Sequence, residues 1–346
     1  EYISKNKKVN FEFKMNHHHE KERIITFDRI KIKSNYKYLL NTKVRFNERF
    51  HSRSGEKTGL FYSSKDDINV PYNLYIAVSY PKQTLTLEFS SKILKENYPK
   101  LISKDTIKEC LININQLDIC EIDVDSVLTE GAITSVDATY DTNFILDDEP
   151  LNALNSQVSN YRRFKWTHYD KEGITFTKDV KSKDCTETIT LYNKEKEICT
   201  SHNKDFLNSL SRPQSIIDYF KGKTRFEITL DTPQKIMKYL NVADTKIFTV
   251  LNSNTNPILT QFDKVFGNSP ANMPNTTFDD YENWAMKIIL EKYNGDLKRL
   301  EQDVRSKFSS RSGATKRMKK FETVYRTIVS ASTCENPIEK IRNLLL

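Results

Sequence analysis

The sequence predicts an α+β fold: a largely antiparallel central sheet with helices packed on one face, followed by a smaller helical C-terminal domain. Up to residue 232 the chain carries short runs in which apolar and polar residues alternate, as in half-buried strands. Helix-like segments separate several of these runs, and beyond residue 232 helical spacing replaces the alternation. Strands mixed with helices in this way favour an antiparallel sheet with one covered and one open face.

The first strands are expected where β-branched and aromatic residues alternate with polar ones, at 29–33, 73–79 and 84–89. A helix is expected at 104–117, and the strand that follows contains Asp137. The order strand, helix, strand is that of an α+β domain.

The segment Asp-Asp-Glu-Pro at 147–150 predicts a helix at 151–164, because acids are favourable near a helix N-terminus. The runs at 173–177 and 187–192 predict a pair of strands, and helical spacing resumes at 206–220. Three further helices are expected, at 233–240, 279–290 and 296–304.

The first 22 residues are polar and charged around three adjacent histidines, His17, His18 and His19. Adjacent histidines suggest a metal site, but no apolar residue separates them and no strand pattern surrounds them. A flexible segment or the remnant of a purification tag is therefore the preferred interpretation.

The amino-acid composition limits the partners and the function classes that the sequence allows. The formal net charge of +8 suits a polyanionic partner, although abundant lysine is also typical of AT-rich genomes. The five cysteines form neither a Cys-x-x-Cys pair nor a disulfide framework, which favours reduced thiols in the cytoplasm. No apolar run suits a membrane span and no glycine-rich phosphate loop is present, so membrane insertion and nucleotide-driven helicase activity are not expected.

Three predicted strands each carry an acid among small hydroxyl side chains: Glu88, Asp137 and Glu227. Acids gathered on one polar surface repel one another unless a cation joins them. Carboxylate oxygens favour Mg²⁺ or Mn²⁺ as that cation. The alternative is that each acid is simply an exposed residue on a half-buried strand.

Tyr192 ends the strand at 187–192 and is followed at short range by Lys194 and Glu197. A phenol with a pKa of about 10 needs a neighbouring cation or base to act as a nucleophile at neutral pH. Lys194 lies on the same side as Tyr192 if the strand persists, where it could stabilise phenolate or phosphate charge; the alternative is an exposed lysine. Arg225 could clamp a phosphate or pair with a neighbouring acid.

The segments SVDATYD (135–141), LYNKEKE (191–197) and TRFEITL (224–230) resemble the replication initiator endonucleases of the filamentous-phage gene II type and their phage and plasmid relatives. Glu88 within LTLEFSSKIL and the helix start at Pro233 also resemble that family. The similarity covers roughly residues 24–245 and is patchy between the motifs.

The resemblance implies that Tyr192 is the tyrosine that attacks DNA and that Lys194 and Glu197 are the basic and acidic positions after it. It matches Asp137 and Glu227 to the acids of two other strands. We expect Mg²⁺ or Mn²⁺ on these two acids, with Glu88 or Glu197 as a third ligand, to polarise a phosphate oxygen.

The function implied is that of a metal-dependent DNA nickase and ligase that starts and ends rolling-circle replication in the cytoplasm of a bacterial host. Attack by the tyrosine would leave a 5′-phosphotyrosyl link and a 3′-hydroxyl that a polymerase can extend. The expected partners are double-stranded origin DNA, single-stranded DNA, and a host helicase and polymerase. The alternatives are a conjugative relaxase or transposase with the same chemistry, and a DNA-binding repressor or copy-control protein that cuts nothing.

The stretch from 305 to 320 is strongly basic and has no acid. Such a run predicts a phosphate-contacting surface, whereas the alternative is a basic connector between two helices. The chain is therefore expected to divide into a flexible segment (1–22), a catalytic domain (23–232) and a basic, helical DNA-binding domain (233–346). The predicted DNA contacts are Arg305, Lys307, Arg311, Lys316, Arg317, Lys319 and Lys320.

Overall fold

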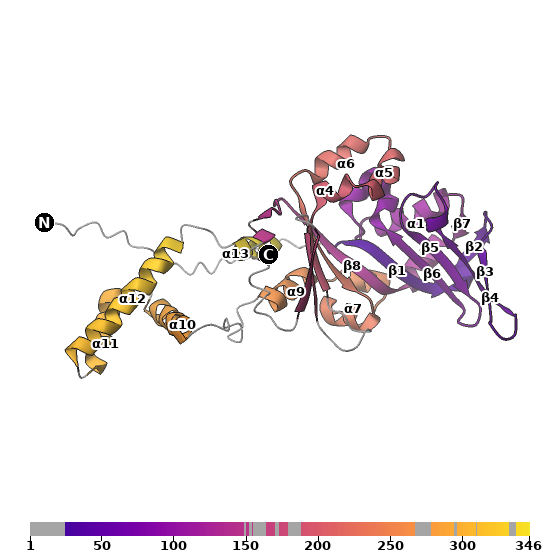
Figure 1. Cartoon of the computed structure of the whole chain (residues 1–346). Coiled ribbons are helices and arrows are strands. Elements are labelled where there is room, and N and C mark those ends of the chain that lie inside the picture. Colours follow the sequence, from indigo (N-terminus) through magenta and orange to yellow (C-terminus); the bar gives the residue numbers. More distant parts are fainter. Residues whose placement is uncertain are drawn as a thin grey trace. The chain divides into compact units, whose positions relative to one another are not determined.

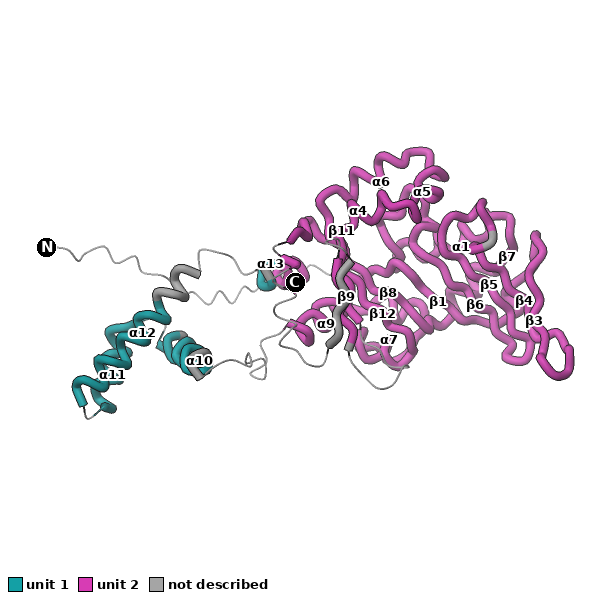
Figure 2. The backbone as a smooth tube through the Cα atoms, viewed as in Figure 1, with its two compact units in different colours: residues 1–21, 268–340 teal, residues 22–267, 341–346 magenta. Residues whose placement is uncertain are grey.

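The computed structural model of the chain describes residues 25–148, 150–151, 154, 164–169, 173–178, 188–266, 278–293, 296–308, 310–331 and 337–346. The chain forms two compact units, one of residues 22–267 with 341–346 and one of residues 1–21 with 268–340 (Figures 1 and 2). The segment 1–22 with its three histidines lies outside the described residues, as does most of the helix expected at 151–164.

The larger unit is built on a ten-stranded antiparallel sheet, which confirms the predicted fold class. The strand order across the sheet is β3-β4-β5-β6-β1-β8-β12-β11-β10-β9, and β2 and β7 form a separate small sheet. The strands are β1 (Phe27–Asn35), β2 (Leu39–Thr42), β3 (Asn47–Phe50), β4 (Lys57–Ser63), β5 (Leu74–Ser79), β6 (Thr84–Ser90), β7 (Cys120–Ile122), β8 (Ala132–Thr142), β9 (Phe164–Tyr169), β10 (Gly173–Lys178), β11 (Thr188–Asn193) and β12 (Thr224–Leu230).

Helices of the larger unit lie around this sheet (Figure 1). The 3-10 helices are η1 (Tyr36–Tyr38), η2 (Ser64–Asp66) and η3 (Ser91–Lys100). The α-helices are α1 (Ile107–Gln116), α2 (Val124–Glu130), α4 (Lys194–Ile198), α5 (Ser201–Asn208), α6 (Pro213–Phe220), α7 (Pro233–Leu240), α8 (Ile247–Leu251) and α9 (Pro257–Phe266).

The helix expected at 206–220 is two helices, α5 and α6. Pro213 occupies the first turn of α6, where its missing N–H costs nothing. A proline also restricts the residue before it, and Arg212 has extended φ of −135° rather than a helical value. The chain therefore breaks between the two helices.

The sheet has an apolar and a polar face. Side chains such as Ile30, Leu87 and Ile228 are buried on the apolar face, and α9 covers part of it through Phe266, whose ring centroid lies 5.1 Å from that of Phe176. On the polar face, partly exposed hydroxyl and charged side chains alternate with these apolar residues along β1, β6, β8 and β12. The predicted alternation of the strands is thus present in the fold.

The division between the units follows Gly267 rather than residue 232. Helices α7 and α9 contact β8 and β12, and they bury Ile236, Leu240 and Phe262 completely or nearly so. Because the sheet shields these apolar side chains from water, residues 233–266 belong with the sheet and not with the basic helices.

The smaller unit contains α10 (Phe278–Lys292), α11 (Leu297–Lys307) and α12 (Arg311–Ala331); α13 (Pro337–Leu345) follows. Asp296 caps α11, because its side chain accepts hydrogen bonds from the backbone N–H groups of Lys298 and Arg299. The three helices share one apolar core, formed by Met286, Leu290, Leu300, Val304, Ala314, Met318 and Phe321.

No helix in the described part of the chain combines the length and the apolar character needed to span a membrane. Among the same residues, Cys110, Cys120 and Cys199 are free thiols.

Candidate active site

The polar face brings the predicted tyrosine, arginine and glutamate together. Tyr192 of β11 lies opposite Arg225 of β12, and Arg225 lies opposite Asp141 of β8. Glu227 is two residues beyond Arg225 and therefore points to the same face. The strand register thus gathers these four side chains at one end of the sheet.

Gly173 provides the space that Tyr192 needs. It lies opposite Tyr192 in the pairing of β10 with β11. A Cβ atom at residue 173 would lie only 2.6 Å from Tyr192 Cβ and 2.7 Å from the Leu191 carbonyl oxygen. Any side chain there would displace the tyrosine or its strand, so this glycine maintains the position of Tyr192.

Arg225 is the buried centre of the cluster, with an exposed fraction of 0%. Its guanidinium donates two hydrogen bonds to Asp141, at 2.7 and 2.9 Å, and one to the Tyr98 hydroxyl at 3.0 Å. A further ion pair of 3.1 Å joins Arg225 to Asp28. Arg225 pairs with acids, one of the two roles that the sequence suggested, and it is too enclosed to clamp a phosphate itself.

A β-bulge delivers Asp28 to this cluster. The register of β1 with β8 shifts between Phe27 and Arg29, so Asp28 and Arg29 both contribute to the polar face. Burial opposes ionisation of Asp28, but Arg225 and then Lys194 favour it, and the pKa of Asp28 is lowered. Asp28 is therefore a fixed negative charge beside Arg225.

Tyr192 donates its hydroxyl hydrogen bond to Glu227 Oε1, at 2.9 Å. Burial is the main cause that raises the pKa of Glu227 to about 7, and the charge of Asp28 adds to it. The pKa of Tyr192 is raised well above its ordinary value, by burial first and by Glu227 second. A carboxyl that titrates near neutrality and contacts a phenol is suited to receive the phenol's proton.

Lys194 reaches the cluster through a strand-to-helix junction. β11 ends at Asn193, whose side chain caps α4 by accepting from the Lys196 N–H at 3.0 Å. Lys194 is only 1% exposed, and its Nζ lies 5.6 Å from the centroid of the Tyr192 ring. The strand does not persist to Lys194, but helix α4 still brings Lys194 to the tyrosine.

Glu197 holds Lys194 in place by an ion pair. Asn203 of α5 donates to Glu197 Oε1 at 3.0 Å, and Lys92 of η3 donates to Asn203 Oδ1 at 2.5 Å. Although burial disfavours the carboxylate, Lys194 overcomes this effect and the pKa of Glu197 is lowered. Glu197 is thus the counter-ion of Lys194 in this structure.

A second ion cluster occupies the polar face beside the first. Arg29 donates to both oxygens of Asp137, at 2.7 and 3.0 Å, and to Glu88 at 2.9 Å. Lys31 also contacts Glu88 at 3.0 Å, and the Thr229 hydroxyl donates to Asp137 at 2.8 Å. Asp137 and Glu88 therefore converge on a guanidinium.

The four predicted metal ligands are distributed over three sets of contacts. Asp137 and Glu88 bind Arg29, Glu197 binds Lys194, and Glu227 accepts from Tyr192. Within the described ranges, no three His, Cys, Asp or Glu side chains are arranged as a metal site. The structure does not bring the four carboxylates together into one ligand set.

Several residues of the cluster escaped the sequence analysis. Arg29 lies in a segment in which apolar and polar residues alternate, so the sequence could place it on the polar face. The sequence could not show which acids Arg29 contacts. Asp28 reaches that face only through the bulge. Tyr98 and Lys92 come from η3, which has an irregular backbone at Lys95, with φ of 52°. No pattern in the sequence indicated this irregularity.

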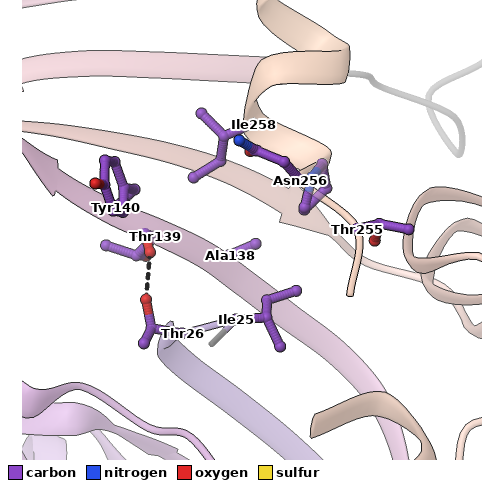
Figure 3. Close-up of a pocket in the computed structure, with 9 residues that line it drawn as sticks. Ile25, Thr26, Ala138, Thr139, Tyr140, Thr255, Asn256 and Ile258 are labelled. Atoms are coloured by element: carbon purple, nitrogen blue, oxygen red, sulfur yellow. Dashed lines mark hydrogen bonds between the residues drawn. The ribbon is translucent and has the colours of Figure 1, made fainter. Parts of the chain in front are cut away.

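A small pocket lies elsewhere on the sheet unit, between Ile25, β8 and the start of α9 (Figure 3). The Thr26 hydroxyl donates to the Thr139 carbonyl at 2.6 Å beside it. Its lining side chains are apolar or neutral, among them Ala138, Asn256 and Ile258. The pocket therefore lacks the charged groups found around Tyr192, where Lys194, Arg225 and Glu227 together with Tyr192 form what we call the tyrosine cluster.

The basic run divides between α11 and α12, and acids from other parts of the helices neutralise much of it. Arg305 pairs with Glu301 and Lys307 with Asp303, one helical turn away. Arg317 and Lys320 both contact Glu282 of α10. Within the described residues, three exposed cations of the run have no ion pair: Arg311, Lys316 and Lys319.

No protein-family model matches this sequence, and no curated protein is significantly similar to it.

The buried pair of Arg225 and Asp141 predicts a large stability effect. Arg225→Gln should lower the free energy of unfolding by about 3–5 kcal/mol, because it leaves the enclosed carboxylate of Asp141 without its cation. Arg29→Gln is the matched control, since Arg29 also pairs with acids but its side chain is 22% exposed. Urea unfolding should rank the Arg225 variant as clearly less stable; equal losses in the two variants would contradict the central role of Arg225.

Proposed function

We propose that the chain is a DNA strand transferase that nicks one strand through Tyr192 and later rejoins it, as a rolling-circle replication initiator would. The observation that carries this proposal is the hydrogen bond from Tyr192 to Glu227 beside two buried cations, Arg225 and Lys194. A tyrosine with a base in contact and positive charge nearby has the parts that an activated nucleophile requires.

In the proposed reaction, Glu227 takes the phenolic proton as Tyr192 Oη attacks the phosphorus of a DNA phosphodiester. The bond between phosphorus and the 3′-oxygen breaks, and that oxygen receives a proton as the 3′-hydroxyl forms. The strand is then held by a 5′-phosphotyrosyl link, whose reversal rejoins the DNA without another energy source. The positive charge of Lys194 near the ring lowers the cost of forming the phenolate.

Arg225 acts in this scheme as a positioning residue. Its contacts with Asp141 and Asp28 fix strands β12, β8 and β1 against one another around Glu227. Its Nη1 atom lies 3.9 Å from Glu227 Oε1, near enough for its charge to favour the ionised carboxylate. Loss of Arg225 would therefore disturb the base as well as the fold.

The requirement for Mg²⁺ or Mn²⁺ stays a prediction. A divalent ion, when bound, would polarise a non-bridging phosphate oxygen. Of the predicted ligands, Glu227 suits the ion best, because its ion-pair contact with Arg225 is as long as 3.9 Å and burial leaves its charge poorly compensated. Asp137 would have to exchange its contact with Arg29 before it could join Glu227.

Two alternatives differ from this proposal in distinct ways. A conjugative relaxase or transposase would use the same tyrosine chemistry on a different DNA site. A DNA-binding repressor or copy-control protein would bind DNA and form no covalent link. The contact between Tyr192 and Glu227 favours the catalytic classes, because a protein that only binds DNA has no need of a base at its tyrosine.

The tyrosine assignment is tested by covalent capture. The wild-type chain, incubated with supercoiled DNA of its own replicon in Mg²⁺ or Mn²⁺, should form a denaturation-resistant adduct that EDTA suppresses. Tyr192→Phe should abolish the adduct and retain DNA binding, whereas Tyr219→Phe, which changes a tyrosine on α6, should behave as the wild type. An adduct that persists in Tyr192→Phe and maps to another tyrosine would show that the nucleophile is misassigned.

The pH dependence of nicking tests the base. Because Glu227 must be ionised to accept a proton, the single-turnover rate should rise about tenfold per pH unit and level off above pH about 7. Glu227→Gln should lose this rise and most of the rate. A pH dependence of the nicking rate that is the same in Glu227→Gln as in the wild type would assign the titration to another group.

The same titration predicts a pH dependence of stability. The pKa of Glu227 is higher in the folded state than its ordinary 4.5, so the wild type should lose stability relative to Glu227→Gln as the pH rises from 4.5 to about 7.

The basic helices are tested by salt dependence. Arg311, Lys316 and Lys319 are exposed, so changing all three to Gln should lower the slope of log affinity for duplex DNA against log salt by up to about 2.7. The matched control changes Arg317 and Lys320, which hold Glu282, and should alter the slope less. Equal slopes in the wild type and the triple variant would leave this run as a connector between helices.

A further inference from the structure

A cluster of two aromatic rings and an arginine lies on the polar face of the sheet, at the end opposite to β9 in the strand order. Phe61 of β4 and Tyr75 of β5 have ring centroids 6.2 Å apart and an interplanar angle of 34°. The Arg49 guanidinium of β3 lies 4.9 Å from the Phe61 centroid and 6.0 Å from the Tyr75 centroid, and it donates a hydrogen bond to the Tyr75 hydroxyl. We call Arg49, Phe61 and Tyr75 the aromatic platform.

The rings of the platform are accessible from solvent. Both are partly exposed, and their neighbours on this face are small: Ala77 lies opposite Phe61, and Gly59 lies opposite Arg49. A Cβ atom at residue 59 would lie 2.1 Å from the Val78 carbonyl oxygen, so the glycine is required by the close approach of β5. Arg49 covers part of one side of the rings, and the small neighbours leave the remaining ring surface accessible to a flat ligand.

Cations line the face between the platform and the tyrosine cluster. Tyr75 lies opposite Glu88, whose carboxylate is neutralised by Arg29 and Lys31. Lys33, one pleat further along β1, is exposed. Three cations, Arg29, Lys31 and Lys33, thus share this part of the face with two acids, Glu88 and Asp137. The excess of one positive charge suits a ligand that carries phosphates.

The platform and Tyr192 lie on one continuous face. The register runs from Tyr75 to Glu88, from Glu88 to Lys31, and across β8 and β12 to β11. Five strand steps separate β5 from β11, about 24 Å across the sheet at roughly 4.8 Å per step. Tyr75 is level with Ser135 of β8 and Tyr192 with Asp141, so the path also runs about 20 Å along the strands at roughly 3.4 Å per residue. Several nucleotides of an extended single strand can cover this path (β5 and β11 are labelled in Figure 2).

We infer that this face binds single-stranded DNA, whose bases stack on Phe61 and Tyr75 while Arg49, Lys31 and Lys33 contact its phosphates. A single strand is favoured over a duplex because only unpaired bases can offer their faces to aromatic side chains. The inference rests on the proposed function, since it supplies the surface that leads a strand to Tyr192. It assigns the two DNA forms to different surfaces: the single strand to the sheet and the duplex to the basic helices.

The test measures equilibrium binding of a fluorescein-labelled oligothymidine to the full chain, with Tyr192→Phe present in every protein so that no covalent link forms. Phe61→Leu and Tyr75→Leu should each weaken binding at least about fivefold, because each removes one stacking surface. Tyr75→Phe keeps the ring and should bind nearly as well as the parent. The matched control is Phe248→Leu, which removes a 47% exposed ring on α8, and it should leave the affinity unchanged.

The outcomes separate this inference from the proposed chemistry. If the platform variants bind the oligonucleotide as tightly as the parent and remain folded by circular dichroism, the inference is overturned even if Tyr192 forms an adduct. If the wild type forms no adduct but the platform variants still lose affinity, the inference stands without the nicking function. Equal losses for a duplex probe, or tighter binding of an oligouridine RNA than of DNA, would also overturn it.

Discussion

The buried ion pair between Arg225 and Asp141 is the interaction on which the rest of the site depends. A guanidinium removed from water is costly unless all of its charge and its N–H groups are compensated. Arg225 obtains this compensation from β8, β1 and η3 through Asp141, Asp28 and Tyr98. The same contacts therefore stabilise the fold and fix β12, which carries Glu227 and pairs with the end of β11 that carries Tyr192.

The enclosed position of the cluster also explains why the pKa values of its acids shift in opposite directions. Asp28 contacts a cation directly and stays ionised, whereas Glu227 is further from any positive charge and titrates near neutrality. Two carboxyl groups in one environment thus have separate tasks: one balances charge and the other can exchange a proton. The Arg225 Nη1 atom lies 3.1 Å from Asp28 Oδ1 and 3.9 Å from Glu227 Oε1, so less than 1 Å separates the direct ion pair from the weaker contact.

Alternation along the strands was enough to predict much of the site. It gave the antiparallel sheet, and it placed Tyr192, Arg225 and Glu227 where their strands could meet on one face. It could not reveal Asp28, because a bulge changes the alternation of β1 at that residue. Local sequence rules assume a regular pleat, whereas a bulge is set by how two distant strands pair.

The pattern of charges along the sequence predicted where charged side chains lie better than it predicted which groups they contact. The acids at Glu88 and Asp137 do share a polar surface, but Arg29 joins them in this structure. Likewise, the run at 305–320 is acid-free in sequence, and yet four of its seven cations pair with acids one helical turn away or on α10. Contacts of this kind depend on tertiary structure, which net charge along the chain does not encode.

The short edge strand β3 has a consequence for how molecules of this protein meet. Its four residues are all exposed, and a register irregularity separates Arg49 from Phe50 in its pairing with β4. A brief, irregular edge with charged side chains is a poor template for a further strand. This border of the sheet is therefore protected against edge-to-edge aggregation, even though it carries aromatic groups that a concentrated solution would otherwise bring together.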